Sequence, residues 1–476
     1  MFSSKKLNAI MFTGLLLRAI PLIVWTRWPC VRDECTYLKL ADRMVEGEGM
    51  TSSVGWLWAP GYPSLIALHQ LIFGHGSFIK GTQVVISVAV TYLMYLLGKR
   101  FASISWASLE NDSDENTKAH QESVERAGLL SAALYALSPT QIFFAQSLWS
   151  EVLYGGLLLL TIFIFVTAIQ HRQHLKYAAW IGVLVGFCVL FRGVATYMLP
   201  IFFCAFLWKS YRNSLAWKQS GIVVLLCVST VAPYSLYVSQ KFDHFIVSDR
   251  TLGQMMWLGN NDFKPIAFDW GNGPLSGRAF KRHTKEGRKP CGSKKQPMER
   301  ETCQTEAGKK WILDNSKEFV SRMPLRVAQL LNPHSFLTRH LRMGFWRGIP
   351  QWVDETIVLW NLFWNLLVLL GGSAFLALRG RGAGAILISG ILLYHVAAIS
   401  VLAGLTRYRV PLEPLLMIFL AGGLSLSKAD WGREIRKIGQ DRWRFGMTIV
   451  LLLVIYPLVF WFFPAGWPWW RSWSFL

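Results

Sequence analysis

Long apolar runs recur along the chain and are separated by short polar or charged stretches. Most of these runs have roughly 16 to 22 residues, the length that an α-helix needs to cross the hydrocarbon core of a bilayer. The pattern predicts an all-α polytopic membrane protein with eleven transmembrane helices. The predicted spans are Leu7–Trp25, Thr82–Leu97, Ala127–Phe143, Leu148–Ala168, Tyr177–Leu190, Ala195–Leu207, Gly221–Val238, Thr356–Leu378, Gly384–Leu402, Pro411–Leu426 and Gly446–Phe463.

The composition agrees with this fold class. Of the 476 residues, 53% are hydrophobic, 14% are aromatic and only 16% are charged, whereas average soluble proteins have about 25% charged residues. A net charge of +21 would suggest a nucleic-acid partner in a soluble protein, but loop Lys and Arg that set membrane topology explain most of it here. We therefore expect no nucleic-acid partner. We also expect the first helix to be retained, because no small-residue cleavage site precedes Pro29.

The basic residues of the short loops fall on one side of the predicted membrane. With the N-terminus in the cytoplasm, they gather in the inner loops, as the positive-inside rule requires. These residues are Lys99/Arg100, His171/Arg172/Lys176, Lys209/Arg212/Lys218, Arg379/Arg381 and the cluster from Lys428 to Arg444. The expected localisation is that of a multi-pass integral protein of a bacterial inner or plasma membrane.

This topology divides the chain into three regions. An N-terminal transmembrane region (1–240) includes a first outer loop (26–80), in which we expect the catalytic residues. A long non-cytoplasmic loop (241–355) and a C-terminal transmembrane region (356–476) follow. The active site is expected on the non-cytoplasmic side.

The first outer loop carries the pattern of an amphipathic helix. Its apolar residues at helical spacing are Tyr37, Leu40, Ala41, Met44 and Val45. This spacing predicts a helix that lies in the membrane interface and does not cross it. Asp33 stands at its start, where a carboxylate can cap free N–H groups, and that structural role is the simplest one for Asp33 taken alone. The apolar run Leu65–Phe73 is too short to span and predicts a second interfacial or re-entrant helix.

The second outer loop is strongly basic in its middle, from Lys281 to Lys295. An excess of positive charge outside the membrane favours an anionic partner, either lipid phosphate or an acidic glycan. The alternative is a basic loop that is simply solvated. Long translocated segments are largely exempt from the positive-inside rule, so the topology leaves both interpretations open.

The cysteines support the predicted sides of the membrane. Cys188, Cys204 and Cys227 fall within predicted spans, and the remaining four fall in the two outer loops: Cys30, Cys35, Cys291 and Cys303. Four cysteines in an oxidising compartment permit three pairings, and the pair that we expect is Cys291–Cys303, which closes the basic loop. A zinc site is the alternative, but the spacing matches no standard zinc motif.

Charged residues also gather at the outer ends of the predicted spans. They are Asp33 and Glu34 after the first span, Glu151 in the fourth, Arg192 between the fifth and sixth, and Arg407 and Arg409 before the tenth. Carboxylates there can take a proton from an acceptor hydroxyl or amine, and arginines hold phosphate through paired N–H donors. The constellation predicts a lipid-linked phosphate leaving group held beside a base. The alternatives are arginines that only snorkel to the interface and a structural ion pair of Glu151.

At these residues the sequence resembles the GT-C membrane glycosyltransferases, above all the protein O-mannosyltransferases and the lipid A aminoarabinose transferases. A further likeness is the segment Gly253–Asn261, which resembles the Gly-Asn stretch that opens their large outer loop. The motifs that carry the resemblance are Asp33-Glu34 with Tyr37 and Ala41, Trp58-Ala59-Pro60-Gly61-Tyr62-Pro63, Ser150-Glu151, Phe191-Arg192-Gly193 and Arg407-Tyr408-Arg409-Val410-Pro411.

The resemblance implies an inverting transfer of a sugar from a polyprenyl-phosphate carrier to a lipid, glycan or protein acceptor, with membrane lipids around the protein. It implies Asp33 as the general base, with Glu34 beside it and Glu151 as a further catalytic carboxylate. The donor phosphate is expected at Arg192, Arg407 and Arg409. The expected substrate-binding residues, which lie in the same motifs, are Tyr37, Tyr62, Tyr408 and Asn260.

Two alternatives stay open at this point. A ligase or oligosaccharyltransferase acting on a lipid pyrophosphate is disfavoured, because the second outer loop has no clear acidic metal-binding cluster. A lipid flippase or transporter would need ionisable residues near mid-membrane and repeat symmetry; only His395 and Arg18 qualify, and no repeat is evident. We assign no metal ligands and no certain cofactor, and a divalent metal is optional because phosphate is already a good leaving group.

Overall fold

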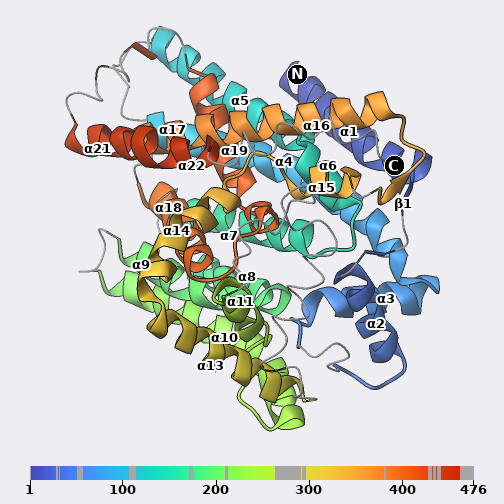
Figure 1. Cartoon of the computed structure of the whole chain (residues 1–476). Helices are drawn as coiled ribbons and strands as arrows, with labels where there is room; N and C mark the ends of the chain where they lie inside the picture. Colours follow the sequence, from blue (N-terminus) through green and yellow to red (C-terminus); the bar gives the residue numbers. More distant parts are fainter. Residues whose placement is uncertain are drawn as a thin grey trace.

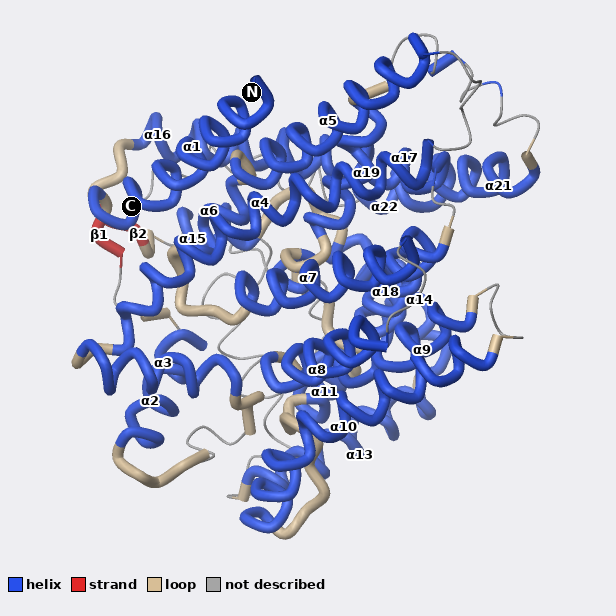
Figure 2. The backbone as a smooth tube through the Cα atoms, turned by 180° about the vertical axis from the view of Figure 1, so that it is seen from behind, coloured by secondary structure: helices blue, strands red, loops and turns tan. Residues whose placement is uncertain are grey.

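The chain folds almost entirely into helices (Figures 1 and 2). The computed structural model describes residues 2–27, 30–31, 33–50, 57–106, 114–170, 175–208, 213–262, 291, 296–342, 344–379, 382–426, 431–432, 436 and 441–460. The predicted basic middle of the second outer loop (281–290 and 292–295) and the aromatic C-terminal segment lie outside these ranges.

The predicted all-α polytopic fold is confirmed. Within the described ranges, six helical stretches are long and apolar enough to cross a membrane. They are α1 (Phe2–Val24), α4 (Ile79–Trp106), α7 (Glu151–Gln170), α10 (Ser214–Phe242), α16 (Gln351–Leu366) continued through η5 (Leu367–Gly371) into α17 (Gly372–Arg379), and α18 (Ala383–Val401).

The other five predicted spans correspond to shorter or bent apolar helices. One is a bent pair, and the remaining four are shorter than a straight crossing requires. They are α5 (Asp114–Ala136) with α6 (Pro139–Ala145), α8 (Leu175–Phe191), η3 (Gly193–Met198) with α9 (Leu199–Leu207), α19 (Glu413–Leu424), and α21 (Arg442–Val450) with η7 (Leu451–Ile455) and α22 (Tyr456–Phe460).

The span predicted over Ala127–Phe143 is not one straight helix. It breaks between α5 and α6, which meet at a bend of 57°. Pro139 has no N–H and disfavours helical geometry in the residue before it, and Ser138 accordingly adopts an extended conformation with ψ 116°. The Ser138 hydroxyl caps α6 by accepting a hydrogen bond from the Gln141 N–H at 3.4 Å. The break leaves the last carbonyls of α5 without partners in their own helix.

Arg18, in the middle of α1, supplies those partners. Its guanidinium donates to the carbonyls of Ala136 at 2.9 Å and Tyr135 at 3.2 Å, and its Nε donates to the Ser87 hydroxyl on α4 at 2.7 Å. The side chain is fully buried. Arg18 therefore joins three spanning helices. This structural role explains why an arginine lies within a span, so Arg18 no longer supports the transporter alternative.

Replacing Arg18 with leucine should destabilise the protein. The change removes the Arg18 hydrogen bonds to the carbonyls of Ala136 and Tyr135 and to the Ser87 hydroxyl, which we expect to cost about 2–4 kcal/mol. A thermal melt of the purified protein in detergent should show a clear drop in Tm, whereas Arg43→Leu on the half-exposed face of α2 should change Tm much less. An unchanged melt for Arg18→Leu would contradict this role.

Both predicted outer loops, residues 26–80 and 241–355, contribute helices. The first contains α2 (Asp33–Val45), which confirms the predicted amphipathic helix, then α3 (Gly61–Phe73) and η1 (Gly76–Phe78). Figure 1 shows α2 and α3 packed together, away from α1. The described helices of the second loop are α11 (Leu252–Gly259), α13 (Pro297–Asp314), α14 (Ser316–Leu330) and α15 (Phe336–Arg342).

The two outer loops are tied to each other by backbone pairing. Strand β1 (Thr26–Arg27) pairs antiparallel with β2 (Trp346–Arg347), and the Arg250 N–H donates to the Leu57 carbonyl at 2.8 Å. These contacts bring the start of α2, the α10–α11 connection and the segment before α16 around one space. The short helix η6 (Thr406–Arg409) precedes α19, and its residues Arg407 and Tyr408 face the same space.

Candidate active site

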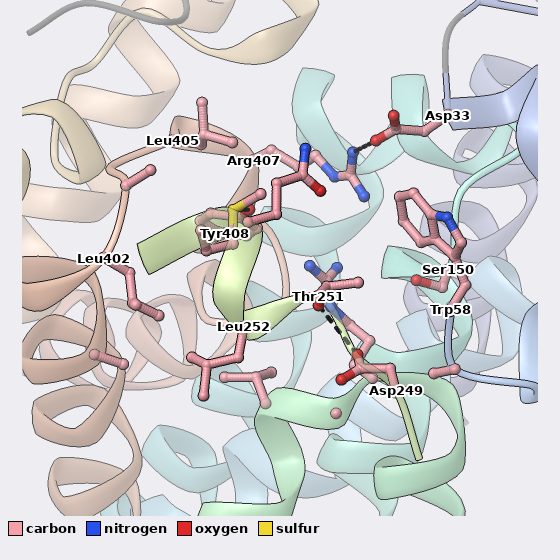
Figure 3. A pocket seen from close by; sticks show the side chains of 18 of the residues that line it. Asp33, Trp58, Ser150, Asp249, Thr251, Leu252, Leu402, Leu405, Arg407 and Tyr408 are labelled. Atoms are coloured by element: carbon pink, nitrogen blue, oxygen red, sulfur yellow. Dashed lines mark hydrogen bonds and ion pairs between the residues drawn. The ribbon is translucent and has the colours of Figure 1, made fainter. Parts of the chain in front are cut away.

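A cavity of 1180 Å3 opens where the two outer loops meet the ends of the spanning helices. Its volume exceeds the ~300–1,000 Å3 that is usual for small-molecule sites. One side is polar and carries Asp33, Ser150 and Arg407, while another is apolar and carries Leu252, Leu402 and Leu405 (Figure 3). The cavity can therefore accommodate a ligand with both a charged and an apolar part.

Four predicted residues form a continuous chain of ion pairs at the polar side. Arg407 Nη1 donates to Asp33 Oδ2 at 2.6 Å (Figure 3), and Arg407 Nε donates to Glu151 Oε1 at 2.5 Å. The same Glu151 oxygen accepts from Arg192 Nη1 at 2.8 Å. The structure thus brings together residues up to 374 positions apart in the chain.

Each of these residues stands at the end of a helical element. Asp33 begins α2, Glu151 begins α7, Arg192 directly follows α8, and Arg407 lies in η6. Helix termini leave backbone groups that polar side chains or ligands must satisfy. The helix ends therefore concentrate charge and hydrogen-bonding capacity at one place in an otherwise apolar protein.

Aromatic rings hold the two arginines in place. The guanidinium carbon of Arg407 lies 4.7 Å from the centre of the Trp149 ring. That of Arg192 lies 5.7 Å from the Tyr154 ring and 5.8 Å from the Tyr408 ring. Such cation–π contacts fix the planes of the guanidinium groups.

The guanidinium group of Arg407 stays positively charged in this site. Burial alone would lower the pKa of Arg407, but the carboxylates of Glu151 and Asp33 raise that pKa well above its ordinary value. Of the four side chains, Asp33 is the most exposed at 37%, against 13% or less for the other three. Asp33 is therefore the carboxylate that a substrate in the cavity can reach.

Tyr37 and Tyr408, which were predicted to bind substrate, also line the cavity. The Tyr37 ring packs edge-on against Trp58 at 5.1 Å and against Tyr62 at 5.0 Å. Tyr62 itself lies behind this wall, fully buried, and its hydroxyl donates to Gln83 at 2.8 Å. The structure thus gives Tyr62 a packing position outside the cavity lining.

Glu34 is buried beneath the site and faces the backbone. Its Oε1 accepts from the Leu148 N–H at 2.9 Å and its Oε2 from the Val31 N–H at 2.8 Å. Because Leu148 belongs to the turn that leads into Glu151, the carboxylate fastens the start of α2 to the start of α7. Glu34 thus aligns Asp33 with Glu151 but does not line the cavity.

Arg409 and Asn260, two further predicted site residues, also lie outside the cavity lining. Arg409 is buried, pairs with Glu413 at 2.8 Å and donates to the carbonyls of Leu330 and Asn332. Asn260 donates to the Val401 carbonyl at 3.0 Å. Arg409 thus joins η6 to α19 and α14, and Asn260 joins the end of α11 to α18, so the structure gives both residues packing roles.

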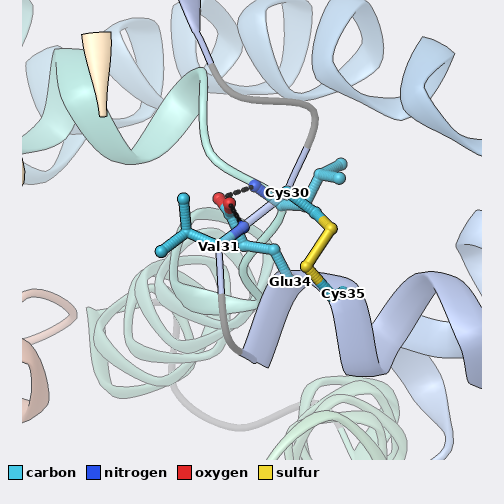
Figure 4. Close-up of a disulfide and its surroundings, with 5 residues drawn as sticks. Cys30, Val31, Glu34 and Cys35 are labelled. Atoms are coloured by element: carbon cyan, nitrogen blue, oxygen red, sulfur yellow. Dashed lines mark hydrogen bonds between the residues drawn. A yellow bond between two sulfur atoms is a disulfide. The ribbon is translucent and has the colours of Figure 1, made fainter. Parts of the chain in front are cut away.

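Two disulfides link cysteines of the outer loops. The predicted Cys291–Cys303 pair is confirmed, and Cys30 pairs with Cys35 (Figure 4). The Cys30–Cys35 bond encloses the start of α2, including Asp33 and Glu34, whose carboxylate accepts from the Val31 N–H. The position of Asp33 is therefore fixed both covalently and through Glu34.

Several cavity residues had no signal in the sequence. Asp249, Arg250 and Glu301 come from the second outer loop, and Trp149 and Tyr154 flank Glu151. A charge in a polar loop carries no expected energetic cost, so charge patterning could not single out Asp249. The aromatic residues were indistinguishable from the many others in the spans.

No metal site is evident in the part of the chain that the structure describes. It contains no group of three or more His, Cys, Asp or Glu side chains arranged to hold a metal ion. The carboxylates of the cavity are paired with arginines or with hydrogen-bond donors instead. No metal is assigned to the site.

Three comparisons with known proteins bear on these observations. No curated protein matches the chain. Among solved structures, the Archaeoglobus fulgidus oligosaccharyltransferase with Zn and sulfate is 13% identical with a TM-score of 0.49 over 95% of this chain, and the chain spans about half (52%) of that protein. ArnT from Cupriavidus metallidurans, bound to undecaprenyl phosphate, is 12% identical with a TM-score of 0.38 over 92% of this chain and 80% of ArnT.

The sequence family described as dolichyl-phosphate-mannose-protein mannosyltransferase matches residues 121–234. This segment includes α6 to α9 and most of α10, and it contains both Glu151 and Arg192. The predicted resemblance to the GT-C membrane glycosyltransferases is confirmed over this segment.

Proposed function

We propose that the protein is an inverting glycosyltransferase that moves a sugar from a polyprenyl-phosphate carrier to an acceptor on the non-cytoplasmic face of the membrane. The observation that carries the proposal is the chain of ion pairs from Asp33 through Arg407 and Glu151 to Arg192 at the cavity wall. It provides a base and an anion-binding pair within one site. A lipid, glycan or protein would be the acceptor.

The cavity has the charge balance of an anion site. Among the residues that the structure describes, the lining contains five arginines, Arg192, Arg250, Arg300, Arg339 and Arg407, and three carboxylates, Asp33, Asp249 and Glu301. Counting Glu151 behind the wall, the arginines still exceed the carboxylates by one. A phosphate with its negative charge completes this balance, and the guanidinium groups offer it paired N–H donors.

The apolar side of the cavity suits a prenyl chain. Leu402 and Leu405 lie at the end of α18, and Leu252 begins α11 (Figure 3). A polyprenyl phosphate could place its phosphate near Arg407 and its first prenyl units along these leucines. Burial of each CH₂ group there would contribute about 0.8 kcal/mol.

The Asp33–Arg407 ion pair implies that the donor binds before Asp33 accepts the proton. Arg407 Nη1 donates to Asp33 Oδ2 at 2.6 Å. A donor phosphate competes for the same guanidinium, so its binding releases the Asp33 carboxylate to act as a base. Donor binding would therefore activate the residue that later takes the acceptor proton.

The transfer step then follows from the positions of these groups. The acceptor hydroxyl or amine attacks the anomeric carbon, the bond from that carbon to the phosphate oxygen breaks, and its electron pair leaves with the phosphate. The acceptor proton passes to Asp33. The charge that develops on the leaving phosphate is stabilised by the fixed guanidinium groups of Arg407 and Arg192.

A binding experiment tests the proposal before any acceptor is known. Purified protein in nanodiscs should bind undecaprenyl phosphate much more tightly than undecaprenol, which has the same chain without the phosphate. Native mass spectrometry or a titration would measure both affinities. Equal affinities would mean that the cavity does not recognise phosphate, and would contradict the proposal.

The Cys30–Cys35 disulfide should be needed for activity. Replacing both cysteines with serine frees the segment that positions Asp33, and misplacement of a catalytic group by about 1 Å can cost up to about 10²-fold in rate. We expect sugar transfer to fall by about 10–100-fold with little change in donor affinity. The matched control removes Cys291 and Cys303 in the same way.

The control pair lies outside the cavity lining. Its loss should lower stability, since a disulfide contributes typically about 2–4 kcal/mol, but at a temperature where the protein stays folded it should leave transfer nearly unchanged. Equal effects of the two double variants on transfer would refute a specific role for Cys30–Cys35.

A further inference from the structure

The proposed mechanism leaves two carboxylates of the cavity unused, of which Glu301 pairs with Arg250 at 3.2 Å. Asp249 lies on the connection between α10 and α11 and lines the same cavity as Asp33 and Arg407 (Figure 3). It comes from the second outer loop, whereas Asp33 comes from the first. Asp33 and Asp249 therefore come from different loops that line one cavity.

Asp249 is held in a fixed orientation. Its carboxylate accepts a hydrogen bond from the Thr251 hydroxyl at 3.4 Å (Figure 3) and lies directly against Gly193. Gly193 directly follows Arg192, so these contacts also fix Asp249 relative to an arginine of the predicted phosphate site. A carboxylate has about four lone-pair positions, which leaves acceptor capacity for a ligand.

The position of the Asp249 carboxylate requires glycine at position 193. A Cβ atom placed on Gly193 would lie 2.3 Å from Oδ1 and 2.6 Å from Oδ2 of Asp249. Such distances are far below van der Waals contact, so any larger residue must displace the carboxylate. Gly193→Ala therefore offers a way to move Asp249 without changing it.

The chemistry of Asp249 selects a kind of ligand group. Burial raises the pKa of Asp249 to about 6, so the carboxyl is mostly ionised at pH 7 and acts as an acceptor. An ionised carboxylate repels phosphate but accepts hydrogen bonds from hydroxyl groups. In the donor lipid, the group attached directly to the phosphate is the hydroxyl-rich sugar.

We propose that Asp249 determines donor specificity by accepting hydrogen bonds from hydroxyl groups of the donor sugar, while Arg407 and Arg192 hold the phosphate. This inference rests on the proposed function and adds a sugar subsite to it. It divides recognition of the donor between two sets of side chains. The arginines bind the charge that all polyprenyl phosphates share, and Asp249 binds the part that differs among them.

The test compares a polyprenyl-phosphate sugar with the same lipid phosphate lacking the sugar. In Asp249→Asn, the Kd of the sugar-bearing lipid should rise by about 10–100-fold, the usual effect of losing hydrogen bonds to a charged group. The Kd of the lipid phosphate without sugar should stay within about twofold. Gly193→Ala should change the two affinities in the same direction as Asp249→Asn.

Asp243→Asn provides the matched control. Asp243 lies on the same connection, is exposed and has a positive φ of 52°, a conformation that asparagine adopts as readily as aspartate. It is absent from the cavity lining, so its replacement should alter neither affinity. A thermal melt of each variant shows whether it is folded.

Four outcomes would overturn the inference. Equal weakening of both lipids by Asp249→Asn would make Asp249 part of the phosphate site or of the fold, and unchanged affinities would remove it from recognition. A large loss of kcat with intact donor affinity would make Asp249 the general base. Failure of the wild type to bind either lipid would reject the proposed function itself, a result distinct from the other three.

Discussion

Asp33→Asn should lower sugar transfer by about 10²–10⁴-fold, the usual contribution of a positioned acid or base. Asparagine keeps the shape of the side chain, and its carbonyl oxygen can still accept from Arg407. It also caps a helix about as well as aspartate does, so α2 should stay in place. What it cannot do is accept the proton of the acceptor, and donor affinity should therefore survive.

Asp42→Asn is the control for this experiment. Asp42 is also on α2 and partly exposed, but it does not line the cavity. Transfer by this variant should equal that of the wild type. If Asp33→Asn also transfers sugar at a near-normal rate, Asp33 is only a helix cap and the base must be sought elsewhere.

Arg407→Lys should weaken donor binding by about 10–100-fold, because a hydrogen bond to a charged group typically contributes about 1.5–3 kcal/mol and lysine cannot replace the paired N–H donors. Lysine keeps the positive charge but cannot contact Asp33 and Glu151 with separate N–H groups as Arg407 does. It also loses the planar stacking on Trp149. The measurement is the Kd for undecaprenyl phosphate.

Arg409→Lys separates recognition from stability. Arg409 is two residues away and equally buried, but its contacts are Glu413 and the carbonyls of Leu330 and Asn332. We expect both lysine variants to lower Tm and only Arg407→Lys to weaken donor affinity. Equal losses of affinity in the two variants would mean that Arg409 also takes part in donor binding. No loss in either variant would mean that Arg407 does not bind the donor phosphate.

Much of the fold could be predicted because a bilayer imposes a simple rule. A backbone in hydrocarbon must satisfy its own hydrogen bonds, so each long apolar run had to be a helix. The break before Pro139 was not predicted, although the proline stands in the sequence. Its cost depends on whether something satisfies the freed carbonyls, and Arg18 does so from a helix more than 100 positions away.

The site could be predicted in part, for a related reason. Charges at the ends of apolar spans are costly unless used, and this singled out Asp33, Arg192 and Arg407 correctly as neighbours of one cavity. The same reasoning could not separate Arg407 from Arg409, because within a 3₁₀ turn the two side chains point to different surroundings that the sequence does not reveal. Asp249 was not predicted, because a charged residue in a polar loop has no energetic cost that would mark it as functional.

The most direct test of the central claim is sugar transfer by the purified protein. Wild type and Asp33→Asn would be incubated with polyprenyl phosphates carrying a labelled sugar and with extracted envelope lipids, glycans and proteins as acceptors. The account predicts that the wild type releases polyprenyl phosphate as it labels an acceptor with inverted anomeric configuration, and that Asp33→Asn binds the donor but does neither at a comparable rate. Absence of transfer by the wild type from every such donor, or equal transfer by both proteins, would contradict it.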